Sequence, residues 1–174
     1  EEDEEELGEA EARQFRAGAA RANYMALDRP DCSFAAKELC RRMAAPTRRD
    51  LAELRRVAQY LLGEPRVVYH FGWQADGEII RAFVDTDFAG CSETRRSTSG
   101  GCMLRGSHLV KHWSTTQKTV TMSSGEAELA GVVKGAGEGL GFLGLCDDLE
   151  APSTLQVHTD SAAAIGICKR SGIG

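Results

Sequence analysis

The chain has 174 residues, a hydrophobic fraction of 42% and a formal net charge of −5, a composition that excludes wholesale disorder and suits one domain with or without a second small unit. No uninterrupted apolar stretch approaches the length of a transmembrane helix, and the acidic start is unlike a signal peptide. We therefore expect an intracellular protein, cytoplasmic, nuclear or both, that has no membrane partner.

The charge is unevenly distributed along the chain. Residues 1–11 hold eight of the 26 acidic residues and no basic one, so we expect a disordered acidic tail. Residues 12–77 carry twelve Lys/Arg against seven Asp/Glu, and residues 78–174 carry nine against eleven. A basic segment beside concentrated carboxylates suits a polyanion that meets a metal site, although two solvated surfaces would give the same imbalance.

Three helices are predicted over residues 12–77. The first covers 12–26, and the second begins near Asp31 or Ser33 and ends before Pro46. The second helix is expected to direct inward Phe34, Leu39 and Met43.

The third helix has start and stop signals at both ends. Asp50 is expected to cap it with Glu53 three residues later, and Gly63 and Pro65 to end it. Its apolar stripe consists of Leu51, Leu54, Val57, Ala58 and Leu61.

The pattern changes to strands after Pro65. Alternation predicts strands over residues 66–71, 79–87, 101–105, 108–114 and 155–159, with a turn at 75–77 and helices over 124–149 and 161–169. This order predicts an α/β (α+β) fold in which a mixed sheet carries flanking helices. The long helix contains seven glycines, each costing about 0.5–1 kcal/mol, so its stripe of Leu129, Val132, Val133, Ala136, Leu140 and Leu143 must be held by packing.

Carboxylates end two of the predicted central strands. Asp85 and Asp87 share one face of their strand, and Asp160 ends another, where ligands of open sheets are found. Asp160 is also well placed to cap the following helix. In the segment S-S-G-E-A-E, Glu126 has capping-box spacing from Ser123, so we assign Glu126 to the cap and Glu128 to the site.

An oxygen-only cluster of Asp85, Glu128 and Asp160 suits Mg²⁺ or Mn²⁺. Two such ions about 4 Å apart activate water and stabilise the leaving oxygen at a phosphodiester. Spacing alone leaves other roles open for each of the three carboxylates.

Five segments carry a more specific signal: N-Y with R-P-D at 23–31, D-T-D-F-A-G at 85–90, R-R-S-T-S-G at 95–100, W-x-x-x-Q-x-x-V with S-S-G-E-A-E at 113–128, and T-D-S at 159–161. In this order they resemble the end of the reverse transcriptase and the ribonuclease H domain of copia-type retrotransposon Pol polyproteins. The resemblance implies three parts, namely 1–11 as a tail, 12–77 as a helical reverse-transcriptase connection and 78–174 as a ribonuclease H-like domain.

The same resemblance implies metal-dependent hydrolysis of the RNA strand of RNA–DNA hybrids during reverse transcription, with the rest of the polyprotein as a partner. Asp85, Glu128 and Asp160 match the first three catalytic carboxylates and metal ligands, and Asp87 is a further possible ligand. The residues expected to contact nucleic acid are Arg95, Arg96, Lys111, Gln117 and Lys118.

The sequence also departs from the family pattern. Ser161, Leu129 and Thr116 stand where the family often has Asn, an aromatic residue and Lys. No acidic residue follows Asp160, whereas the family's fourth carboxylate lies on a later helix, so we expect an incomplete C-terminus and weak or absent activity. The alternatives are a catalytically inactive nucleic-acid-binding remnant and a relic that folds poorly.

Overall fold

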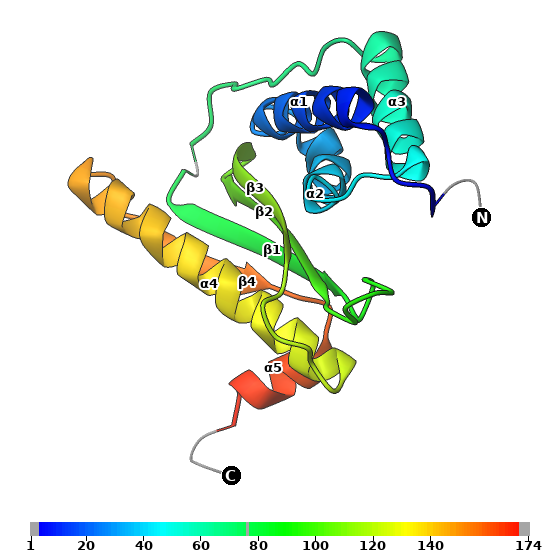
Figure 1. Cartoon of the computed structure of the whole chain (residues 1–174). Coiled ribbons are helices and arrows are strands. Elements are labelled where there is room, and N and C mark those ends of the chain that lie inside the picture. The colour runs from blue at the N-terminus through cyan, green and yellow to red at the C-terminus, as the bar shows by residue number, and fades with distance from the viewer. Residues whose placement is uncertain (1–3, 76, 171–174) are drawn as a thin grey trace. The chain divides into compact units, whose positions relative to one another are not determined.

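The computed structural model describes residues 4–75 and 77–170, and contacts divide the chain into two units, Glu1–Tyr69 and His70–Gly174 (Figure 1). The boundary between the units at 69/70 lies before the predicted boundary at 77/78, because the residues that precede β1 are bound to the second unit. Gln74 donates a hydrogen bond from Nε2 to the Arg105 carbonyl, and its Oε1 accepts one from the Ser107 backbone. The predicted turn at 75–77 includes Asp76, which lies outside the described residues.

The first unit is helical, as predicted. It contains α1 (Glu9–Met25), the short 3₁₀ helix η2 (Pro30–Cys32), α2 (Ser33–Arg41) and α3 (Arg48–Gly63). Its core consists of Phe15, Ala19, Ala22, Ala26, Ala36 and Leu39, with Leu7, Met43, Leu54 and Val57 packed against it. Small residues dominate the buried face of α1, so this helix approaches its neighbours closely.

The expected disorder of residues 1–11 is wrong for residues 4–11. Glu6 forms an isolated β-bridge with Thr47, and the Glu5 carboxylate accepts a hydrogen bond from Arg48 at 2.7 Å. Leu7 packs on the core and α1 already begins at Glu9. One apolar anchor and a basic partner therefore order an acidic segment whose composition alone predicts disorder. Residues 1–3 lie outside the described residues.

Two details of the helices differ from prediction. The N-cap of α3 is Thr47, and Asp50 is its capping-box partner three residues later, so the box begins one turn earlier than expected. Phe34 is 54% exposed with the Lys37 ammonium over its ring, whereas Leu39 is buried. Five residues of helix rotate a side chain by about 140°, so Phe34 and Leu39 cannot share the buried face.

The second unit is a four-stranded mixed sheet with the order β3-β2-β1-β4 (Figure 1). β1 (Ile79–Asp87), β2 (Thr98–Arg105) and β3 (His108–Thr116) are antiparallel neighbours, and β4 (Thr154–His158) pairs in parallel with β1. The helices are α4 (Ser124–Asp148) and α5 (Ala162–Cys168). This is the predicted ribonuclease H-like α+β arrangement.

The strand predicted over residues 66–71 is wrong, since these residues form no strand. Its residues have no sheet ladder to join. Tyr69 instead donates a hydrogen bond to the Asp28 carbonyl, and the Phe71 ring lies edge-on to His108. Residues 66–71 are all exposed, so their apolar side chains do not form the buried face of a strand.

The face of α4 that packs on the sheet combines buried glycines with part of the predicted stripe, since Val132 and Leu143 pack against the core. Gly131, Gly135 and Gly139 are buried at intervals of four residues, whereas Val133 and Leu140 are more than 60% exposed. A methyl group added at Gly135 would lie 2.4 Å from Val84 Cγ1, and one at Gly139 would lie 2.5 Å from Leu155 Cδ1. The helix thus lies so close to β1 and β4 at these glycines that a side chain there would clash with the sheet.

We expect Gly135→Ala to lower the free energy of unfolding by roughly 1–2 kcal/mol, because overpacking against Val84 exceeds the gain in helix propensity. The matched variant Gly137→Ala has open space around its new methyl group, and should raise stability by about 0.5–1 kcal/mol. Urea unfolding monitored by circular dichroism measures both. Equal shifts of the two midpoints would contradict the close packing of α4.

Among the described residues, α4 is also long and apolar enough to cross a membrane by length and composition. The expectation that no uninterrupted apolar stretch reaches that length still holds, since Lys134 and Glu138 lie within the helix. Exposed apolar side chains such as Val133, Leu140 and Leu145 raise the hydropathy of this helix. Its buried residues nevertheless pack on the sheet.

Candidate metal centre

Asp85, Glu128 and Asp160 converge although they are far apart in sequence. One carboxylate oxygen from each lies within 4.8 Å of the others. Asp85 lies near the end of β1, Glu128 in the second turn of α4, and Asp160 two residues after β4. β1 and β4 are parallel and pair Phe83 with His158. Continuing this register by two residues places Asp160 beside Asp85, which explains how the two strand ends build one site.

Asp160 is not the cap of α5. Ser161 is the N-cap, and its Oγ accepts a hydrogen bond from the Ala164 backbone at 3.2 Å. Thr159 Oγ1 accepts one from the Ser161 backbone. Because a neighbouring serine caps the helix, the Asp160 carboxylate is directed to the cluster, and one of the two roles considered for it is excluded.

Glu126 and Glu128 at the start of α4 lie in different places, as predicted. Ser123 is the N-cap and accepts a hydrogen bond from the Glu126 backbone at 3.2 Å, while Glu126 Oε2 accepts one from the Met122 backbone at 2.8 Å. Glu126 therefore serves the helix start, one residue earlier than in a standard capping box. Glu128, two residues later, belongs to the cluster.

The Glu128 carboxylate lies in an environment that disfavours its charge. Desolvation, and then the charges of Asp85 and Asp160, raise the pKa of Glu128 above its ordinary value, while the Thr86 backbone acts in the opposite direction. Its Oε2 atom is buried and has no hydrogen-bond partner among the described residues. A bound cation would relieve both the repulsion and the missing partner.

Replacing Glu128 with glutamine should raise the free energy of unfolding at pH 7 without metal by on the order of 1 kcal/mol. The raised pKa means that the folded state favours the protonated acid. Protonated Glu128 therefore contributes its full stability to the fold below the ordinary pKa of glutamate. This contribution is lost as the pH rises through the raised pKa of Glu128 in the folded state. The gain should therefore disappear near pH 4. Urea unfolding at both pH values measures it, with Glu126→Gln as control, and a Glu128→Gln variant less stable than wild type at pH 7 would contradict the account.

Asp87 shares the exposed face of β1 with Asp85 but does not belong to the cluster. Its carboxylate folds over the turn that follows the strand, where a methyl group at Gly90 would lie 1.8 Å from Asp87 Oδ2. The geometry thus favours Asp85 over Asp87 as the carboxylate of β1 in the site.

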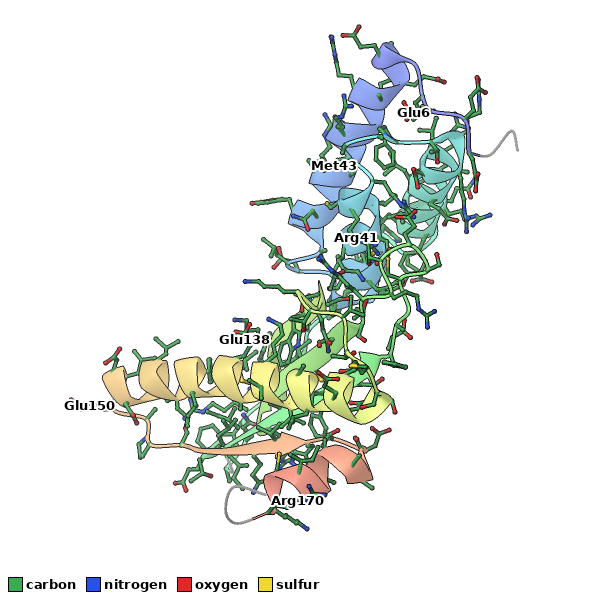
Figure 2. All side chains as sticks on the ribbon, turned by 60° about the horizontal axis from the view of Figure 1, so that its bottom comes forward. Glu6, Arg41, Met43, Glu138, Glu150 and Arg170 are labelled. Carbon is green, nitrogen blue, oxygen red and sulfur yellow. The ribbon has the colours of Figure 1, made fainter. Side chains whose placement is uncertain are left out.

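The five residues predicted to contact nucleic acid divide into two groups. Arg95 and Arg96 in the β1–β2 loop and Lys118 after β3 are exposed at the end of the sheet that carries the cluster. Lys111 instead lies midway along β3 and pairs with Glu138 of α4, which Figure 2 labels. Gln117 is bound internally, since its amide nitrogen donates to Ser99 Oγ and to the Ala127 carbonyl, each at 2.9 Å.

A buried hydroxyl pair supports the loop after β1, and sequence reasoning missed it. Ser97 Oγ accepts a hydrogen bond from the Ala89 backbone at 3.0 Å and lies 3.2 Å from Thr121 Oγ1. Ser97 is fully buried. Ser97 belongs to the R-R-S-T-S-G segment, but the motif gives no indication that this serine, and not an arginine, organises the loop.

The fold and the cluster together define a ribonuclease H-like domain with an acidic site at the ends of two parallel strands. No family model and no solved structure matches the chain. The chain is 36% identical over 126 residues to the uncharacterized mitochondrial protein AtMg00810 of Arabidopsis thaliana, covering 71% of this chain and 51% of that protein.

Two Arabidopsis thaliana transposon proteins are also similar. The retrovirus-related Pol polyprotein from transposon RE1 is 32% identical over 83% of this chain, and that from transposon RE2 is 35% identical over 66%. The chain spans about half of the mitochondrial protein and only 10% and 8% of the two polyproteins. The chain belongs to the copia-type Pol polyprotein family of retrotransposons.

Proposed function

We propose that this chain hydrolyses the RNA strand of RNA–DNA hybrids with Mg²⁺ or Mn²⁺, as part of reverse transcription by a larger polyprotein. The observation that carries the proposal is the convergence of Asp85, Glu128 and Asp160. The Pol polyprotein relatives support the polyprotein context.

The three residues fit a hard divalent cation. Their ligand atoms are all carboxylate oxygens, which such ions prefer, and the unpartnered Glu128 Oε2 is a free acceptor within the cluster. Asp85, Glu128 and Asp160 would hold the metal. When bound, one or two such ions supply charge that activates water and stabilises the leaving oxygen of a phosphodiester.

The chain's own residues would orient the substrate. Arg95, Arg96 and Lys118 are exposed at the end of the sheet that carries the cluster and suit backbone phosphates. The three carboxylates repel a polyanion unless cations neutralise them, so these basic side chains hold the hybrid at the edge of the cluster.

A catalytically inactive nucleic-acid-binding module is the second candidate. It is favoured by the size of the cluster, which among the described residues contains three carboxylates and excludes Asp87. A fourth carboxylate would be needed to hold two ions fully. We therefore expect slow cleavage, which requires protein in excess over substrate to be measured.

The test is incubation of a hybrid labelled on its RNA strand with excess protein and Mg²⁺ or Mn²⁺. We expect slow RNA cleavage that chelator abolishes, and none of a matched DNA duplex. Glu126→Gln is the control variant because Glu126 lies outside the cluster. Hybrid binding without metal-dependent cleavage would overturn the proposed activity and favour the binding module.

Hybrid affinity should depend on salt through the exposed basic residues. Arg96→Ala should weaken binding and reduce the slope of log affinity against log salt by roughly one. Lys111→Ala should leave this slope unchanged, because Glu138 already pairs with Lys111. Fluorescence anisotropy across a salt series measures both. A larger effect of Lys111→Ala than of Arg96→Ala would contradict the assigned phosphate contacts.

A further inference from the structure

The Gln117 side chain connects the sheet to the first turns of α4. Its Nε2 donates to Ser99 Oγ on β2 and to the Ala127 carbonyl, both at 2.9 Å. Its backbone N–H donates to the Ser97 carbonyl at 2.8 Å. Both amide protons are therefore used inside the protein, and the side chain has no donor left for a nucleic acid.

The Ala127 carbonyl belongs to the peptide group that also contains the Glu128 nitrogen. Ala127 is fully buried, so this peptide is fixed against the sheet on one side and by Gln117 on the other. The Glu128 carboxylate itself has no hydrogen-bond donor on Oε2 and is repelled by Asp85 and Asp160. Contacts of the backbone that carries it must hold Glu128 in the cluster when no cation is bound.

We propose that Gln117 is a positioning residue, which fixes the Ala127–Glu128 peptide so that the Glu128 carboxylate points into the acidic cluster. The consequence for catalysis rests on the proposed nuclease function, whereas the positioning itself does not. Gln117 Oε1 is buried without a hydrogen-bond partner among the described residues. Among the described residues, the hydrogen bonds of the Gln117 side chain are therefore the two that its Nε2 donates to Ser99 and Ala127.

The first test is a double-mutant cycle in the metal-free chain. Gln117→Met keeps the length of the side chain and removes both donors. Glu128→Gln should raise the urea midpoint in the wild-type background, because it removes the charge held beside Asp85 and Asp160. In the Gln117→Met background the same change should raise the midpoint by less than half as much, because an unrestrained Glu128 already turns away.

Glu126→Gln is the matched control for the cycle, and its shift should be equal in both backgrounds. If Gln117→Met does not fold, Gln117→Asn replaces it, since the shorter amide cannot reach both Ser99 and Ala127. Equal shifts of Glu128→Gln in both backgrounds would overturn the positioning role.

The second test separates positioning from substrate contact. In the hybrid cleavage assay with protein in excess, Gln117→Met should lower the maximal cleavage rate constant by tenfold or more and leave the protein concentration that gives half of this rate within twofold. A raised half-maximal concentration with an unchanged maximal rate constant would show that Gln117 contacts the hybrid and would overturn the inference. If wild type cleaves no hybrid but the cycle shows coupling, the proposed function fails and the positioning of Glu128 by Gln117 stands.

Discussion

Asp85→Asn is expected to lower the rate of metal-dependent RNA cleavage by about a hundredfold or more. Asparagine keeps the shape of the side chain, and its oxygen can still accept the hydrogen bond that Asp85 Oδ1 takes from the Thr86 backbone at 2.8 Å. It removes one of three charges that hold the cation. A hundredfold lower rate corresponds to a loss of several kcal/mol of transition-state stabilisation, because about 1.4 kcal/mol changes the rate tenfold. Single-turnover cleavage of labelled hybrid measures it.

Asp87→Asn is the matched control on the same strand face, and it should keep most of the activity because Asp87 lies outside the cluster. Unfolding midpoints of both variants should stay close to that of wild type. Cleavage that survives Asp85→Asn but not Asp87→Asn would show that the carboxylate of β1 has been assigned to the wrong residue.

Phe15→Ala should unfold the first unit while the second keeps its fold and its acidic site. Phe15 is fully buried at the centre of the helical core. Truncating a buried phenylalanine costs about 3–5 kcal/mol, which is comparable to the whole stability of a unit of this size. Amide hydrogen exchange measured by NMR resolves the two units, and protection should be lost in residues 9–63 and kept in β1, β2 and α4.

Phe34→Ala is the control, because Phe34 is 54% exposed and contacts the Lys37 ammonium. It should change stability by less than about 0.5 kcal/mol. Loss of protection in the second unit of Phe15→Ala would show that the two units unfold together and would contradict their independence.

The second unit could be predicted largely from sequence because β1 and β4 alternate between more and less buried residues and turn residues bound the hairpin. The predicted strand over residues 79–87 agrees with β1 at both ends, and the hairpin strands extend only slightly beyond their predicted limits. The packing face of α4 could not be predicted in this way. Apolar periodicity predicts buried side chains at Val133 and Leu140, but both are exposed. The positions that contact the sheet include glycines 131, 135 and 139, where the backbones of the helix and the sheet approach too closely for a larger side chain.

The acidic residues of the site could also be predicted, while their supporting residues could not. Carboxylates at strand ends indicate a site because a sheet brings those ends together. The role of Gln117 depends on where the loop after β3 turns back toward Ser99 and Ala127, and no local pattern encodes that turn. The ion pair of Lys111 with Glu138 could not be predicted for the same reason, because the two residues are distant in sequence.

Anomalous diffraction from crystals soaked in Mn²⁺ shows whether Asp85, Glu128 and Asp160 bind a divalent cation. We expect an anomalous peak among the three carboxylates, with oxygen distances of about 2.0–2.3 Å, and no such peak in Asp85→Asn crystals soaked in the same way. Full occupancy of a Mn²⁺ site elsewhere, or an unchanged peak in Asp85→Asn, would exclude these carboxylates as the metal site.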